Sequence, residues 1–206
     1  LFIPDGRSME WLLSHWQEIK DDTARQSLLV TIHENYQDKR ISAQDWLTAL
    51  LNGLNKEKNT LIASSICRYL HEPLLEAGTD QTEETIWKAA QSHSINSCRI
   101  QLMRCLIARA RSPKSVEKLY QIWSKQSHPM LNIRDYMSLA YVLSLHMPQK
   151  YEEIISTQRA RISNPDRIRE FDFISKAVTP DTLEMDKVFE SLLKAENRRI
   201  EPWAED

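Results

Sequence analysis

Apolar side chains recur at helical spacing along almost the whole chain. Positions three and four residues apart share one face of a helix, so each recurring set predicts an amphipathic helix. Leu12 and Trp16 belong to the first set, and Trp46, Leu50 and Leu54 belong to a later one. Because each set covers only one helical face, no helix can bury its apolar side chains alone. We therefore expect the helices to pack against their neighbours, with the aromatic side chains in the core.

The apolar sets and the start and stop signals between them predict about eleven helices of roughly ten to sixteen residues. Pro73 predicts the end of the helix that carries Leu61 and Ile62, because proline has no amide hydrogen to donate within a helix. The start signals are Ser42, the capping-box-like pair Asp80 and Glu83, Ser112 with Pro113, and the pair Asn132 and Asp135.

The composition favours an all-α protein. The chain of 206 residues has only three glycines and no Asn-Gly pair, whereas β-hairpins depend on such turns. Many helices joined by short loops are typical of stacked antiparallel pairs, so we expect an irregular superhelix, an armadillo- or HEAT-like α-solenoid. No strict repeat and no Pro/Gly/Ser-rich linker occurs, and residues 1–206 are therefore interpreted as one helical domain.

Charge and hydropathy exclude two classes of partner. The formal net charge is −2, with acidic and basic residues interspersed, whereas a nucleic-acid-binding protein would carry a basic excess. No apolar run approaches the ~20 residues that span a bilayer. We therefore expect neither nucleic acid nor a membrane segment, and the sequence leaves the cellular compartment open.

The residues needed for common catalytic sites are missing. A zinc hydrolase uses His-Glu-x-x-His, in which two imidazoles hold the metal and the glutamate activates water. His33-Glu34 and His71-Glu72 begin like this motif, but the second histidine is absent in both. No phosphate-binding glycine loop and no Gly-x-Ser-x-Gly turn occurs. We assign no catalytic, cofactor-binding or metal-binding residue, and we interpret Glu83-Glu84 and Glu152-Glu153 as exposed helix faces.

The cysteines predict buried, reduced thiols. Cys67, Cys98 and Cys105 are odd in number and lack the spacing of a disulfide framework. Cys67 and His71 are four residues apart on one predicted helix, which would permit a polarised thiolate. We favour the simpler interpretation, a buried thiol beside a histidine at the edge of the core.

The segment from Arg159 to Trp203 is the most specific part of the sequence. Asn164 is placed to cap a helix that begins at Pro165, and Asp166 favours the positive helix start. Thr179, Pro180 and Asp181 repeat that arrangement fifteen residues later. The segment closes on Asn-Arg-Arg-Ile-Glu-Pro-Trp. This string resembles the end of the C-terminal helical domain of M1-family zinc aminopeptidases, the aminopeptidase N-like enzymes.

The resemblance implies a noncatalytic role for this chain. In that family the C-terminal domain is a helical superhelix that arches over the zinc-bearing domain and helps to enclose the substrate cavity. The chain would then be a C-terminal fragment of a longer metallopeptidase, with its own catalytic domain and a peptide substrate as partners. One zinc ion is expected in the catalytic domain of the parent protein, and no cofactor is expected in this chain.

Arginines surround the helix start at Asn164, and two more follow near the end of the chain. One interpretation is a solvated surface with ion pairs to Glu170, Asp172 and Glu196. The other is contact with the catalytic domain or with a peptide carboxylate, because a guanidinium binds a carboxylate through two parallel hydrogen bonds. The candidate residues are Arg159, Arg161, Arg167, Arg169, Arg198 and Arg199.

Two alternatives remain open from the sequence. The first is a free-standing helical-repeat scaffold that binds other proteins, which the absence of active-site motifs permits. The second is an enzyme whose catalytic residues come from distant helices, which residue spacing cannot reveal.

Overall fold

The structure, a computed structural model, consists of helices. It describes residues 2–200, with side chains up to Arg198, and contains no strand in that range. The predicted all-α class is therefore confirmed. Contacts between Cα atoms divide the chain into two units, Leu1–Ser115 and Val116–Asp206, here called the N-terminal and C-terminal units. The boundary lies within α8 (Pro113–Lys125).

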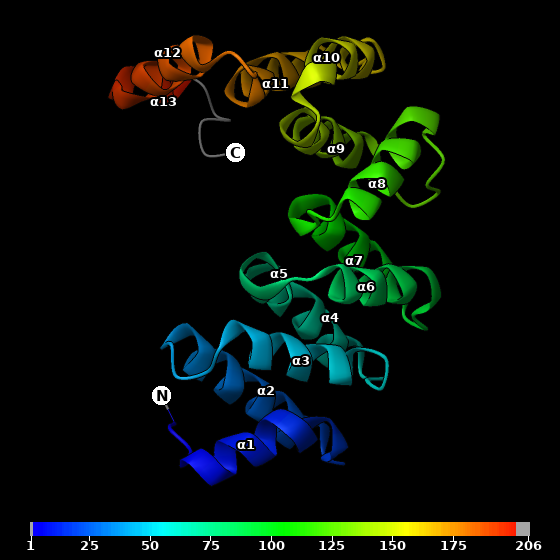
Figure 1. Cartoon of the computed structure of the whole chain (residues 1–206), viewed down its shortest axis with the longest axis vertical. Coiled ribbons are helices and arrows are strands. Elements are labelled where there is room, and N and C mark those ends of the chain that lie inside the picture. The colour runs from blue at the N-terminus through cyan, green and yellow to red at the C-terminus, as the bar shows by residue number, and fades with distance from the viewer. Residues whose placement is uncertain (1, 201–206) are drawn as a thin grey trace. The chain divides into compact units, whose positions relative to one another are not determined.

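In the N-terminal unit, α3 contacts α1, α2, α4, α5 and α6, and α7 packs on α4, α5 and α6 (Figure 1). Trp46, Leu47 and Leu50 of α3 are fully buried. The helices of this unit before α8 are α1 (Gly6–His15), the 3₁₀ helix η1 (Trp16–Glu18), α2 (Asp22–Gln37), α3 (Ala43–Leu54), α4 (Thr60–Tyr69), α5 (His71–Ala77), α6 (Asp80–Ser92) and α7 (Asn96–Arg109).

A glycine permits a close contact between η1 and α3. The indole of Trp16 is fully buried, and its Nε1 donates a hydrogen bond to the Ala49 carbonyl at 3.1 Å. A Cβ atom at Gly53 would lie 2.3 Å from Cζ2 of Trp16. Only glycine therefore fits at this position of α3, one turn after Ala49.

A buried ion pair ties α2 to the loop between α3 and α4. Nε of Arg25 donates to Oε2 of Glu57 at 2.6 Å, and Nη2 donates to Oε1 at 3.0 Å. Oε1 of Glu57 also accepts hydrogen bonds from the backbone amides of Lys58 and Asn59. Burial raises the pKa of Glu57, but these donors outweigh it and keep the pKa below its ordinary value. The sequence pattern did not reveal this contact between distant residues.

The prediction for Pro73 is confirmed only in part. The helix before it, α4, ends at Tyr69, the residue whose carbonyl a helical amide at position 73 would bond, but Pro73 itself lies in the first turn of a new helix, α5. The amides of the first turn need no partner within the helix, so proline is tolerated there. Leu61, predicted to face the core, is 77% exposed.

The predicted start of α6 is wrong by one residue. Thr79, not Asp80, is the N-cap, and it forms a capping box with Thr82. Glu83 is buried instead of lying on an exposed face, and it accepts hydrogen bonds from the backbone amides of Arg111 and Ser112 and from the Ser112 hydroxyl. Burial raises the pKa of Glu83, but these hydrogen bonds lower it below its ordinary value.

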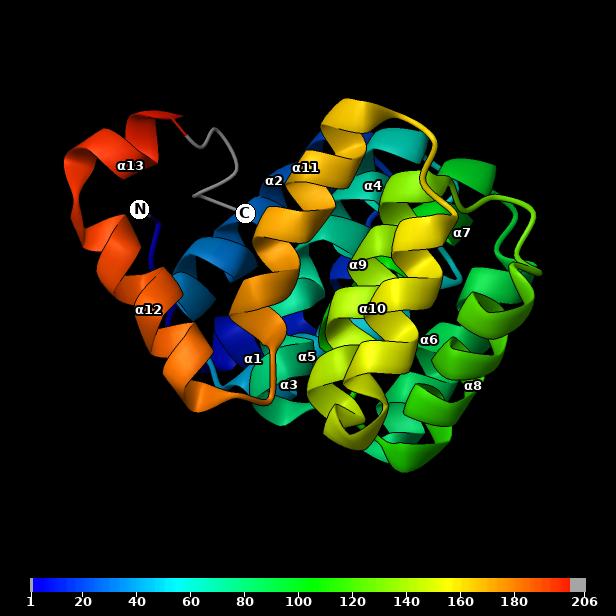
Figure 2. The ribbon, with the colours of Figure 1, turned by 90° about the horizontal axis from the view of Figure 1, so that it is seen from above.

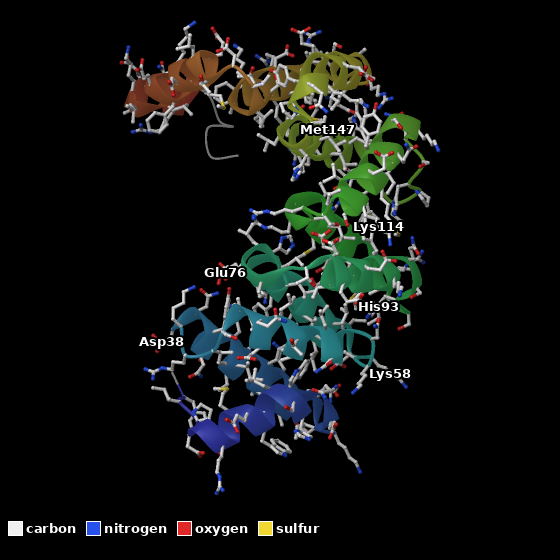
Figure 3. All side chains as sticks on the ribbon, viewed as in Figure 1. Asp38, Lys58, Glu76, His93, Lys114 and Met147 are labelled. Atoms are coloured by element: carbon white, nitrogen blue, oxygen red, sulfur yellow. The ribbon has the colours of Figure 1, made fainter. Side chains whose placement is uncertain are left out.

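The loop after α6 is held by a buried histidine. His93, labelled in Figure 3, places Nε2 2.9 Å from the Leu54 carbonyl. Its Nδ1 accepts a hydrogen bond from the amide of Ile95, so the ring proton belongs on Nε2. The ring therefore joins α3 to the connection between α6 and α7.

In the C-terminal unit, α9 and α10 lie side by side, as both Figure 1 and Figure 2 show. Leu139, Leu143 and Ile154 are fully buried between them. Trp123 of α8 is also buried, and its Nε1 donates to Oε1 of Gln158 at 2.9 Å. The elements after α8 are α9 (Ile133–His146), η2 (Pro148–Lys150), α10 (Tyr151–Ala160), α11 (Pro165–Ser175), η3 (Lys176–Val178), α12 (Thr182–Leu193) and α13 (Ala195–Ile200).

The two proline-containing start signals have different outcomes. Asn164 caps α11, which begins at Pro165 as predicted. Thr179 and Pro180 do not start α12, because Asp181 is the N-cap and accepts from the amides of Leu183 and Glu184. The Thr179 hydroxyl instead accepts a hydrogen bond from the amide of Asp181. It therefore shapes the turn that leads to the cap.

The prediction for the aromatic side chains is confirmed only in part. Trp16, Trp46, Trp87 and Trp123 are buried. Trp11 is 50% exposed and Phe189 is 64% exposed. Trp203 lies outside the described residues.

Candidate functional site

Arg159 of α10 is engaged by a neighbouring helix. Its Nε donates to Oδ1 of Asp172 at 2.7 Å, and its Nη2 donates to Oδ2 at 2.9 Å. Both side chains are exposed, and the carboxylate raises the pKa of Arg159 above its ordinary value. The expected ion pair with Asp172 is therefore confirmed, and the guanidinium already holds a carboxylate from its own chain.

Arg161 has a structural position at the end of α8. Its guanidinium donates to the carbonyls of Trp123 at 2.9 Å and Ser124 at 3.0 Å. It also lies over the Trp123 ring, 5.0 Å from the centroid. The last carbonyls of a helix lack partners within the helix, and cations stabilise them. This arginine therefore holds the turn after α10 against α8.

Arg167 and Arg169 form ion pairs within α11. Nη1 of Arg167 donates to Oε2 of Glu170 at 2.5 Å, which confirms the expected pair with Glu170. Arg169 pairs with Asp166, three residues earlier on the same helix. These pairs lie within the first two turns and do not converge on a common point with the other candidates.

Arg198 donates to the Leu192 carbonyl at the end of α12, whereas Glu196 was the expected partner in this region. The side chain of Arg199 lies outside the described residues. The five described candidates thus bind groups of their own chain, and a role in contacting a catalytic domain or a peptide stays a prediction.

A surface pocket of about 410 Å³ lies between α9 and α11. The two helices are in contact beside it, where the Tyr141 ring of α9 stacks on the Phe171 ring of α11 with centroids 5.1 Å apart. Glu170 is 91% buried at this pocket, and only its Oε2 is engaged by Arg167. The lining residues are Arg134, Met137, Ser138, Tyr141, Glu170 and Ile174.

Arg134 differs from the other arginines of the C-terminal unit whose side chains the structure describes. Its amide donates to Oδ1 of Asn132 at 2.9 Å, in a capping box completed by Asp135. The backbone is therefore fixed by the helix start that the sequence predicts. The exposed guanidinium makes no hydrogen bond or ion pair with any residue whose side chain is described. It is free to bind an anion at the rim of the pocket.

Sequence reasoning missed Arg134 because it belongs to no arginine cluster. The one available signal is its position two residues after the Asn132 cap, which places it in the first turn of a helix. Nothing in the sequence indicates that α11 lies across from that turn. The contact between Tyr141 and Phe171 is one of the tertiary contacts that bring Glu170 to the same pocket.

The cysteines of the N-terminal unit are unsuited to nucleophilic chemistry. All three are free and buried, as predicted. Cys67 lies in α4 and His71 in α5, so the single helix that would place them together does not exist. Burial raises the pKa of Cys67 strongly, and burial with the nearby Arg109 charge lowers the pKa of His71. A thiolate at Cys67 is therefore disfavoured.

Two exposed apolar patches remain. In the N-terminal unit, Phe2, Ile3 and Trp11 line a surface pocket of about 620 Å³. In the C-terminal unit, Leu183, Phe189 and Leu193 are 64–69% exposed on α12. An exposed apolar patch is the kind of surface that marks an interaction site.

Within residues 2–200, no group of three or more His, Cys, Asp or Glu side chains is arranged to hold a metal ion. No helix in the same range is long and apolar enough to cross a membrane. No protein-family model, curated protein or solved structure matches this chain.

Proposed function

We propose that this chain is the noncatalytic C-terminal helical domain of an M1-family zinc aminopeptidase. The observation that carries the proposal is the string from Arg159 to Trp203, with its Asn164–Pro165 helix start and its Arg-Arg-Ile-Glu-Pro-Trp end. The all-helical architecture supports it. The chemistry would belong to a separate domain, because these 206 residues contain no His-Glu-x-x-His motif.

The proposed arrangement is an irregular solenoid of antiparallel helix pairs. Within the N-terminal unit, α6 and α7 pack on each other and are joined by only three residues. Within the C-terminal unit, α9 and α10 pack on each other across the short η2 segment. Short connections favour antiparallel neighbours, and stacked pairs of this kind build α-solenoids.

The proposed partners are the catalytic domain of the parent protein and its peptide substrate. The patch formed by Phe2, Ile3 and Trp11 has the apolar character of a surface covered by another domain. The parent protein would carry one zinc ion in its catalytic domain and would release N-terminal residues from peptides.

The test uses the complete protein encoded by the gene. We expect it to contain about one zinc ion per chain and to release the N-terminal residue from aminoacyl p-nitroanilides until a chelator removes the metal. The 206-residue chain with added zinc should release none. A complete protein without bound zinc and without aminopeptidase activity would reject the proposal, as would turnover by the 206-residue chain.

A free-standing scaffold is the second candidate, and the exposed face of α12 favours it. Leu183, Phe189 and Leu193 would there contact a protein partner. The same experiment separates the two functions, since a scaffold protein would show no zinc-dependent peptide hydrolysis.

A further inference from the structure

The pocket between α9 and α11 combines three chemical features, contributed by both helices. Arg134 offers a cationic fork with no described partner, and Glu170 offers Oε1, which accepts no hydrogen bond from any described side chain. Met137 and Ile174 supply apolar surface between them. The volume of about 410 Å³ falls within the ordinary range for small-ligand pockets.

We propose that this pocket binds the C-terminal residue of a peptide through its free main-chain carboxylate. Arg134 would bind the carboxylate through two parallel hydrogen bonds. Oε1 of Glu170 would accept the N–H of the same residue, and its side chain would lie against Met137 and Ile174. Naming a peptide as the natural ligand rests on the proposed function, whereas recognition of a carboxylate beside an N–H does not.

Charge and burial explain why this pocket differs from the rest of the arginine-rich surface. Arg159, Arg167 and Arg169 already neutralise Asp172, Glu170 and Asp166, so a ligand carboxylate would have to displace a partner. A ligand carboxylate that binds Arg134 displaces no described partner. Glu170 is 91% buried and fixed by Arg167, so its remaining oxygen is held in place before a ligand arrives.

The probe is N-acetyl-leucine, which has the carboxylate, the N–H and an apolar side chain. Titrated into the 206-residue chain and followed by ¹H–¹⁵N NMR, it should shift the amides of Met137, Ser138 and Ile174 in a saturable way. N-acetyl-leucinamide lacks the charge and should bind at least about tenfold more weakly. Arg134→Gln should weaken N-acetyl-leucine binding by a similar factor, and Arg134→Lys, which keeps the charge without the fork, should fall between.

Arg40→Gln is the matched control, because Arg40 is an exposed arginine of the N-terminal unit that pairs with Asp38. It should leave N-acetyl-leucine binding unchanged. Arg134 is exposed, so its replacement should leave the spectrum away from the pocket unaltered.

Three results would overturn the proposal: equal binding of N-acetyl-leucine and its amide, unchanged binding by Arg134→Gln, or saturation by acetate as tight as by N-acetyl-leucine. Equal binding of N-acetyl-glutamic acid α-amide would assign the pocket to an acidic side chain of a partner and would also reject the main-chain carboxylate. The zinc and aminopeptidase measurements on the complete protein are separate, so failure of either proposal is recognised independently.

Discussion

Helices α3 and α12 have the same length and similar starts, but they differ completely in burial. Each has 12 residues and begins at a capping side chain, Ser42 for α3 and Asp181 for α12. Six residues of α3 are buried, whereas no residue of α12 is buried. Local sequence signals therefore start both helices equally well without determining whether either enters a core.

The neighbours account for the difference. Within the N-terminal unit, α3 contacts α1, α2, α4, α5 and α6, so its apolar side chains are enclosed. Within the C-terminal unit, α12 contacts η3 and α13. Leu183, Phe189 and Leu193 are consequently left exposed. An apolar face predicts which side of a helix is suited to packing. It does not predict whether another part of the described chain packs against that side.

The largest expected effect comes from removing equal side chains from the two helices. Leu50→Ala in α3 should lower the free energy of unfolding by about 2–5 kcal/mol, because it leaves a cavity in a fully buried site. Leu183→Ala in α12 should change it by no more than about 0.5 kcal/mol, because that side chain is 69% exposed. Amide hydrogen exchange, resolved for each helix, measures the change in stability in each variant.

Equal costs at the two sites would contradict the comparison. Such a result would mean that Leu183 is covered in solution, and a dependence of the Leu183→Ala effect on protein concentration would identify a second copy as the cover.

A smaller effect is expected at the helix starts. Asp181→Ala should reduce the stability of α12 by about 1 kcal/mol, because the amides of Leu183 and Glu184 lose their acceptor. Thr179→Ala should cost less, since the Thr179 hydroxyl accepts only from the amide of Asp181 in the preceding turn. The hydrogen-exchange rates of the first backbone amides of α12 measure the effect of each substitution. A larger loss for Thr179→Ala would restore the helix start first predicted from the sequence.

The third effect is a modest pH dependence confined to the surroundings of α3. His33 stacks on Tyr69 with ring centroids 3.8 Å apart and lies 6.1 Å from Trp46 of α3. Burial lowers the pKa of His33 below its ordinary value of 6.5, with Arg68 adding to the effect and Glu72 and Glu34 opposing it. The unfolded chain therefore binds a proton at a higher pH than the folded chain, and stability falls as pH drops below about 6.5.

The indole N–H signal of Trp46, followed by NMR through urea unfolding at pH 7 and pH 5, measures this loss. His33→Phe keeps a ring against Tyr69 and should remove part of the pH dependence. His71, whose pKa is also lowered by burial, contributes to the remainder. Residues 182–193 contain no histidine, so α12 should show no corresponding change. If the stability of His33→Phe falls between pH 7 and pH 5 as much as that of the unaltered protein, His33 is excluded as the source of the pH dependence.

Much of the fold was predictable because helical signals are local. The Ser42, Asn132 and Asn164 caps and the start of α8 at Pro113 were identified from neighbours within three residues. Pro73 was misinterpreted in part and Glu83 entirely, because their positions depend on more distant structure. Pro73 is tolerated within α5 because that helix begins only two residues earlier, at His71. Glu83 is buried because the backbone amides of Arg111 and Ser112, far along the chain, donate hydrogen bonds to its carboxylate.

The candidate site was only partly predictable. Ion pairs of the arginines with Asp172 and Glu170 were expected, and the structure shows which arginine each carboxylate binds, Arg159 and Arg167 respectively. Arg134 was missed because a pocket is formed by two helices, and its partner helix α11 lies more than thirty residues further along the chain. Tyr141 contacts Phe171 beside the pocket, and no local signal encodes this contact.

The sequence by itself determined the helical class, the helix starts at Ser42, Pro113, Asn132 and Asn164, and the absence of a His-Glu-x-x-His motif. These properties follow from interactions within one or two turns, which residue order specifies directly. Only the tertiary structure decided that α3 is buried and α12 exposed, that Arg25 meets Glu57, and that Arg134 is left free beside Glu170. Burial and pairing of this kind depend on which distant side chains reach the same place, and that depends on how the helices pack.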